Sequence, residues 1–325
     1  MICRLLIVCI IAFSAWPAYA GQAPRVYGAT FASTFTIYAL SPDLLVGWNG
    51  PLRAYEKKYI LEKYQTLPIL GGWYGQGFFP DREVLMQAGI DQVLLLTNDT
   101  EFTAGVEKAL KEIDLPVLTL RGLYLDDYPT MFRRLGQTFG MPERGDAMAR
   151  FTEKTIAETK TMLGDIPEDK RLRVYLAQEV DGLGTVCDEA NRSELLHLAG
   201  GINVHSCPQM TKESTTKISF EQIMAYDPDV VLIMHPSFVE RFKEDHKWQN
   251  LRAAKEGRIY NVPYEPFCWM DKPSTYMRII ALPWLACTLY PERCTKDLVK
   301  ETRDFMELFF HLDLDDAAIH SILNP

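Results

Sequence analysis

The chain has 325 residues, of which 47% are hydrophobic, and a formal net charge of −9 at pH 7. This length accommodates one large core or two modest ones, and a mean hydropathy of −0.10 excludes a polytopic membrane protein. The negative charge argues against nucleic acid as a partner.

The first 20 residues have the organisation of a secretory signal peptide. Arg4 precedes an apolar run from Leu5 to Phe13, and Ala18-Tyr19-Ala20 resembles a small-residue cleavage site. The apolar run is too short to anchor the chain across a bilayer. We therefore predict a periplasmic mature protein that begins at Gly21. Cleavage removes the one base Arg4 and no acid, so the net charge moves from −9 to −10.

The first half of the mature chain alternates between predicted strands and helices. Strands are expected at 25–30, 44–47, 93–96 and 116–120, and helices at 31–40, from Glu83 onwards and at 103–113. The apolar runs fit buried parallel strands. A glycine-rich loop at 71–80 carries Trp73 and Tyr74, which either have a binding role or fold back onto the core.

Residues 142–164 are predicted to form one amphipathic helix. Apolar residues recur at helical spacing, Pro142 suits the first turn, and Gly164 ends the helix. Because strands alternate with helices on both sides of it, we interpret this helix as a connector between an N-terminal lobe, 21–141, and a C-terminal lobe, 165–325. The alternative is an ordinary surface helix within a single domain.

The second half repeats the pattern, with strands at 172–177, 230–233 and 258–262, a helix at 273–290 and a helical tail from 297. One unit has a counterpart in the first half. Glu83 opens a helix that runs into a strand, Glu221 does the same, and an Asp stands eight residues after each, Asp91 and Asp229. Two matching units favour two related lobes, with ligands bound beyond the carboxyl ends of the strands.

Five cysteines remain after cleavage. The close pairs are Cys187 with Cys207 and Cys287 with Cys294, although the connectivity is open. If both pairs form, Cys268 is left over, and a buried inert thiol is then a more common role than a soft-metal ligand. A secreted metalloenzyme built on His205, His235 and the Cys187 region lacks any recognised metal-ligand spacing.

Six segments occur in a characteristic order along the chain, at 25–48, 83–96, 193–204, 228–233, 248–263 and 267–291. Together they resemble the periplasmic substrate-binding proteins of ABC importers for iron-siderophore, haem and corrinoid uptake, the helical-backbone, TroA-like type. The resemblance implies two Rossmann-like α/β lobes joined by one long backbone helix, with a ligand cleft between them. It further implies a monomer without catalysis or an intrinsic cofactor, which delivers its ligand to a permease dimer in the inner membrane.

The same resemblance assigns roles to individual residues. Glu83 and Glu221 match the acidic residues that pair with permease arginines. The matching ligand-cleft residues are Trp73, Tyr74, Arg121, His235, Phe267, Trp269 and Asp271.

The aromatic and arginine side chains suit a large anionic chelate, which makes an iron-siderophore type complex the first expectation. His235 and Tyr74 are candidates to complete the coordination of its metal. Haem, a corrinoid and direct binding of a transition-metal ion are the alternatives. A lone His is more often a structural residue, and Trp269 and Asp271 also suit a role in holding their loop, with Asp271 capping the helix from Pro273.

Overall fold

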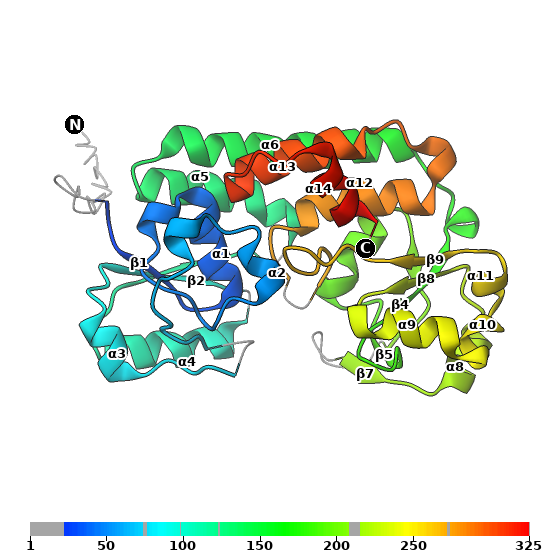
Figure 1. The fold of residues 1–325 in the computed structure, drawn as a ribbon, viewed down its shortest axis with the longest axis horizontal. Coiled ribbons are helices and arrows are strands. Elements are labelled where there is room, and N and C mark those ends of the chain that lie inside the picture. The colour runs from blue at the N-terminus through cyan, green and yellow to red at the C-terminus, as the bar shows by residue number, and fades with distance from the viewer. Residues whose placement is uncertain are drawn as a thin grey trace, which may run out of the picture.

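The computed structural model describes residues 23–324 apart from 74–76, 98, 123, 208–214 and 272–273. Its residues form two parallel sheets, one before and one after the long helix α6 (Pro142–Leu163), in addition to a small antiparallel pair. Figure 1 shows the sheets in two lobes that lie side by side under α6. The predicted α/β fold class with two lobes is confirmed. The predicted signal peptide lies outside the described residues.

The first sheet has the order β1-β2-β3, with all strands parallel. Every residue of β1 and β2 is buried, as the apolar runs predict for parallel strands that are covered on both faces. The elements of this part are β1 (Val26–Gly28), α1 (Phe31–Leu40), α2 (Ala54–Lys57), α3 (Arg82–Gln87), β2 (Gln92–Leu96), α4 (Thr100–Lys111), β3 (Val117–Leu120) and α5 (Tyr128–Thr138).

The second sheet has the order β6-β4-β8-β9 and is also parallel. An antiparallel pair, β5 with β7, follows the carboxyl end of β4. The elements are β4 (Arg173–Ala177), β5 (Gly184–Val186), α7 (Glu194–Leu198), β6 (Ile202–Asn203), β7 (Thr215–Lys217), α8 (Phe220–Tyr226), β8 (Val230–Ile233), α9 (Pro236–Glu244), α10 (His246–Gln249), α11 (Arg252–Lys255), β9 (Ile259–Asn261), α12 (Arg278–Leu289), α13 (Leu298–Phe310) and α14 (Asp316–Leu323).

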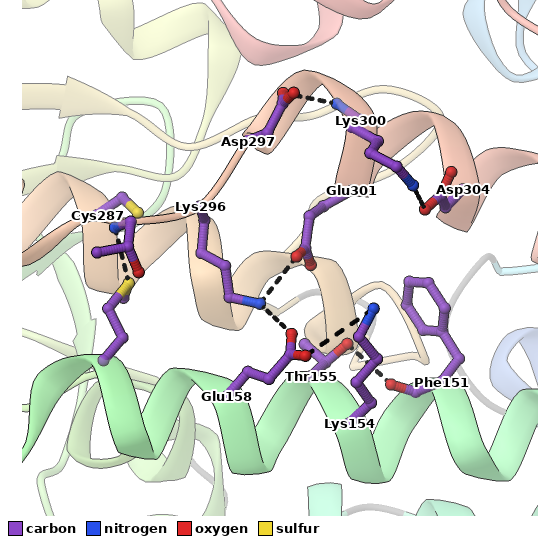
Figure 2. A network of polar contacts seen from close by, with 12 residues as sticks. Phe151, Lys154, Thr155, Glu158, Cys287, Lys296, Asp297, Lys300, Glu301 and Asp304 are labelled. Atoms are coloured by element: carbon purple, nitrogen blue, oxygen red, sulfur yellow. Dashed lines mark hydrogen bonds and ion pairs between the residues drawn. The ribbon is translucent and has the colours of Figure 1, made fainter.

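Helix α6 packs against both halves of the chain. It lies along α5 from the first half and α12 from the second. The approach to α5 requires glycine, because a Cβ added to Gly145 would lie 2.9 Å from the Cα of Gly136. A polar contact adds to the packing: Lys296, just before α13, donates to Glu158 of α6 at 2.5 Å and to Glu301 of α13 at 2.8 Å (Figure 2). These contacts hold α6 along its length.

Two details of the sequence prediction are wrong. Residues 44–47 form no strand, because only Leu45 pairs with the sheet, through a single bridge to Val26. The helix predicted from residue 273 begins at Arg278, since Ser274 and Thr275 are irregular and a turn follows at Tyr276 and Met277. Helix α5, which the sequence analysis did not identify, supplies the close contact with α6. Among the described residues, no helix combines the length and apolar character needed to cross a bilayer.

The cysteine pairs that lie close in the sequence are both disulfides, Cys187 with Cys207 and Cys287 with Cys294. Cys268 is free and buried. Burial raises the pKa of its thiol to about 11, so the thiol stays protonated at neutral pH. This environment favours the inert structural role for Cys268 over metal binding.

Candidate ligand-binding site

The carboxyl ends of the strands place the candidate residues at one edge of each sheet. Because each sheet is parallel, the loops that follow its strands leave from the same edge. Arg121 follows β3 directly at the edge of the first sheet. Gln178 follows β4, and His235 comes two residues after β8, at the edge of the second sheet.

Contacts between loops show that these two edges face each other. Phe31, three residues after β1, and Phe35 pack against Phe267, in the loop after β9, with ring centroids 5.2 and 4.7 Å apart. The backbone amide of Leu125, after β3, donates to the carboxylate of Glu194 at the start of α7, at 3.2 Å. The candidate site therefore lies where the two lobes meet at the carboxyl ends of their strands.

In the first lobe, Arg121 is the residue best placed to meet a ligand. Its side chain is exposed, and it makes no hydrogen bond or ion pair with any described residue. A guanidinium without a protein partner is available to an anionic ligand. Trp73 is half-buried, with its ring 6.2 Å from that of Tyr27. Tyr74 lies outside the described residues.

In the second lobe, His235 caps helix α9. Its Nδ1 accepts a hydrogen bond from the backbone amide of Ser237 at 3.2 Å. A ring nitrogen that accepts carries no proton, so the neutral ring has its proton on Nε2. Nε2 is then a hydrogen-bond donor, and the half-buried ring is better suited to donate to an anion than to coordinate a metal.

Phe267 and Trp269 lie in the loop between β9 and α12, and both side chains are buried. Phe267 is 2% exposed and contacts rings from both halves of the chain, including Phe35 and Phe310. Trp269 is fully buried, and its indole N–H donates to the backbone carbonyl of Glu265 at 3.0 Å. Neither ring presents a surface on which a ligand could stack in this structure.

The carboxylate of Asp271 likewise contacts other protein side chains rather than an open surface. Its buried carboxylate accepts hydrogen bonds from Arg192 at 2.5 Å, from Gln178 at 3.2 Å and from the Ser274 hydroxyl at 3.0 Å. It holds the loop rather than capping α12, which begins only at Arg278.

Arg192 and Gln178, which both donate to Asp271, were not among the site residues predicted from the sequence. Gln178 could have been found from its place directly after a predicted strand, since ligands of parallel sheets bind beyond the carboxyl ends of the strands. Arg192 carries no such signal, because its partner Asp271 lies 79 residues away in the chain.

Glu83 and Glu221 occupy equivalent positions in the two lobes. Both are exposed in the first turn of a short helix, α3 or α8. Figure 1 shows these helices on the side of the molecule away from α6, one in each lobe. Each helix begins beside a capping side chain, that of Asp81 in the first lobe and that of Ser219 in the second.

The equal spacing from Glu to Asp has a shared structural cause. In the first lobe, Asp91 accepts a hydrogen bond from the backbone amide of Arg25 at 2.8 Å, and the Arg25 guanidinium donates to the carbonyl of Ala88. In the second lobe, Asp229 accepts the amide of Arg173 at 2.8 Å, and that guanidinium donates to the carbonyl of Tyr226. Ala88 and Tyr226 each precede the Asp by three residues, so the two lobes repeat one local design. The repeat places one exposed carboxylate on each lobe.

The comparisons with known proteins support the two-lobe fold. A family model described as "Periplasmic binding protein" matches residues 81–266. Among solved structures, an ABC transporter solute binding protein from Sulfurospirillum deleyianum is 33% identical, with a TM-score of 0.86 over 93% of this chain and 94% of that one.

Two curated proteins are similar over part of their length. The Molybdate-binding protein MolA of Haemophilus influenzae is 27% identical over 60% of this chain, and the Fe(3+)-citrate-binding protein YfmC of Bacillus subtilis is 23% identical over 56%. The matched segments span little more than half of these relatives, 55% and 56%.

Proposed function

The chain belongs to the periplasmic binding protein family, and from this premise we propose that it captures an anionic metal complex between its lobes and delivers it to an ABC permease. The observation that carries the choice of ligand is the chemistry at the two facing edges. Arg121 offers a cation from the first lobe that is unpaired among the described residues, and His235 offers an Nε2–H donor from the second. Both groups suit a ligand that is rich in oxygen and negatively charged.

We propose an iron chelate as the first candidate ligand. The similarity to a protein described as binding Fe(3+)-citrate supports this choice. A metal oxyanion is the second candidate, since the relative with the higher identity is described as a molybdate-binding protein. Haem, a corrinoid and a bare metal ion have less support, because Phe267 and Trp269 are buried and the Nε2 of His235 carries a proton. The proposal includes a periplasmic monomer that docks on a permease dimer in the inner membrane.

The test of this proposal is a native mass spectrum with metal analysis of mature protein purified from periplasm without chelators. A bound species of several hundred daltons that contains iron, on the order expected for a small-molecule site, supports the chelate. A small molybdenum or tungsten oxyanion supports the second candidate. A bare cation, or no metal-containing species after titration with ferric citrate and with molybdate, contradicts the proposal.

Replacing Arg121 by Ala is expected to weaken binding of the anion about 10- to 100-fold, since a hydrogen bond to a charged group contributes about 1.5–3 kcal/mol. Isothermal titration with ferric citrate and with molybdate measures the change. Lys111→Ala, which removes an exposed cation from α4 in the same lobe, is the matched control and should leave affinity unchanged. Equal affinities for the Arg121→Ala variant and the control would place the anion elsewhere.

A further inference from the structure

A second cluster of potential ligands lies at the ends of β5 and β6 and shares no residue with the candidate site. Cys187 follows β5, and His205 and Cys207 follow β6. One ligand atom from each of these residues lies within 4.8 Å of the other two. The spacing of these residues in the sequence matches no recognised metal site, and the fold brings the three side chains together.

The two ring nitrogens of His205 differ in their hydrogen bonding. Nδ1 pairs with the hydroxyl of Tyr226 at 2.9 Å, which orients the ring. Nε2 is buried and has no hydrogen-bond partner among the described residues. A buried polar atom without a partner is costly unless something binds it, and a His ligand typically has its second nitrogen hydrogen-bonded in this way.

We propose that reduction of the Cys187–Cys207 disulfide creates a site for a thiophilic divalent cation such as Zn²⁺, with the two sulfurs and one ring nitrogen of His205 as ligands. In a tetrahedral zinc site, two thiolate sulfurs lie about 3.8 Å apart, from Zn–S bonds of about 2.3 Å. The three ligand atoms, which lie within 4.8 Å of one another, come close to that spacing, and the two sulfurs move apart once their bond is cut. The fourth position is open to water or to another ligand.

The backbone around the cluster is held independently of the disulfide. The amide of Asp188 donates to the carbonyl of His205 at 2.7 Å, which joins the two ligand-bearing segments. The side chain of Asn203 donates to the carbonyl of Val186 at 2.8 Å and accepts the amide of His205 at 3.1 Å. The amide of Cys207 donates to the carboxylate of Glu189 at 2.9 Å. Cutting the disulfide therefore leaves the ligands close to one another.

The chemistry proceeds in two balanced steps. A dithiol reductant is oxidised to its cyclic disulfide and transfers two electrons and two protons to the protein disulfide, which becomes two thiols. Binding of M²⁺ then forms two M–S bonds and one M–N bond and releases the two thiol protons. Half-buried Cys207 gives the reductant access to the sulfurs. The disulfide and the bound metal therefore exclude each other, because the two sulfurs either bond to one another or bind the metal.

The test uses the mature protein, reduced with dithiothreitol and desalted without oxygen, and Co²⁺ as the probe. The reduced protein is expected to bind about one equivalent with a thiolate-to-cobalt charge-transfer band, which Zn²⁺ removes, while the oxidised protein binds none. Cys187→Ser/Cys207→Ser should abolish the band, and His205→Ala should weaken binding at least about tenfold. Cys287→Ser/Cys294→Ser and His197→Ala, which alter the other disulfide and an exposed His, are the controls and should bind as wild type.

A second measurement on the wild-type chain covers the case in which a cysteine variant does not fold. Zn²⁺ should protect Cys187 and Cys207, and not Cys287 or Cys294, from alkylation in the reduced protein, as peptide mass analysis would report. Absence of a charge-transfer band in the reduced protein, a band that survives in Cys187→Ser/Cys207→Ser, or equal alkylation of all four cysteines with Zn²⁺ present would overturn the proposal.

Discussion

Reversing both Glu83 and Glu221 to Arg is expected to reduce transport at least about 100-fold while ligand affinity stays within about twofold of wild type. Each carboxylate is exposed, and one lies on each lobe in the same local structure. Two separated carboxylates give a two-point contact with guanidinium groups of a permease, with each charge-assisted contact contributing about 1.5–3 kcal/mol. Reversal replaces both attractions with repulsion. The ligand site, at the facing strand ends, keeps its residues.

Uptake by a reconstituted transporter and ligand titration of the purified variant measure the two effects. The matched control is Glu101→Arg/Glu240→Arg, which changes the net charge by the same amount at two exposed helix positions, one in each lobe. The control should transport as wild type. Loss of ligand affinity in Glu83→Arg/Glu221→Arg, or equal loss of transport in the control, would contradict the docking assignment.

Replacing Phe267 by Ala is expected to destabilise the protein by about 3–5 kcal/mol, the usual cost of removing a buried aromatic ring. Phe267 is 2% exposed, and its ring lies between Phe31 and Phe35 of α1 and Phe310 at the end of α13. The cavity would open where the two lobes touch. Thermal or denaturant unfolding of the purified variant measures the loss.

Phe79→Ala is the matched control, because this ring is 79% exposed and its loss should change stability by no more than about 0.5 kcal/mol. At a temperature where the Phe267→Ala protein is folded, its ligand affinity should resemble that of wild type. Weakened binding with unchanged unfolding would instead place the Phe267 ring in the ligand site, as the family resemblance implies.

The sequence predicted the fold to the extent that local patterns encode it. Apolar runs marked the buried strands β2 and β8, and the helical spacing between Pro142 and Gly164 marked α6 to within one residue. The equal spacing of Glu83–Asp91 and Glu221–Asp229 predicted a repeated unit, because the same cap and turn need the same number of residues in both lobes. The strands and α6 depend on near neighbours in the chain, whereas the bonds of Asp91 and Asp229 reach across 66 and 56 residues.

The candidate site was only partly predictable. The family resemblance named Arg121 and His235, and both follow a strand closely, where ligands of parallel sheets bind. Whether a residue near such an end faces a ligand or the core depends on what packs against it. Phe267 and Trp269 were selected as cleft aromatics, and contacts with distant segments bury both.

The sequence by itself determined the strands, the connecting helix and the repeated helix-strand unit, because each is set by hydrophobic periodicity and by local capping. Only the tertiary structure decided the burial of Phe267, the pairing of Arg192 with Asp271 and the meeting of Cys187 and Cys207 with His205. Those contacts join residues that separate elements carry. These residues are close because of how the sheets and loops pack, and the spacing of residues in the sequence does not predict it.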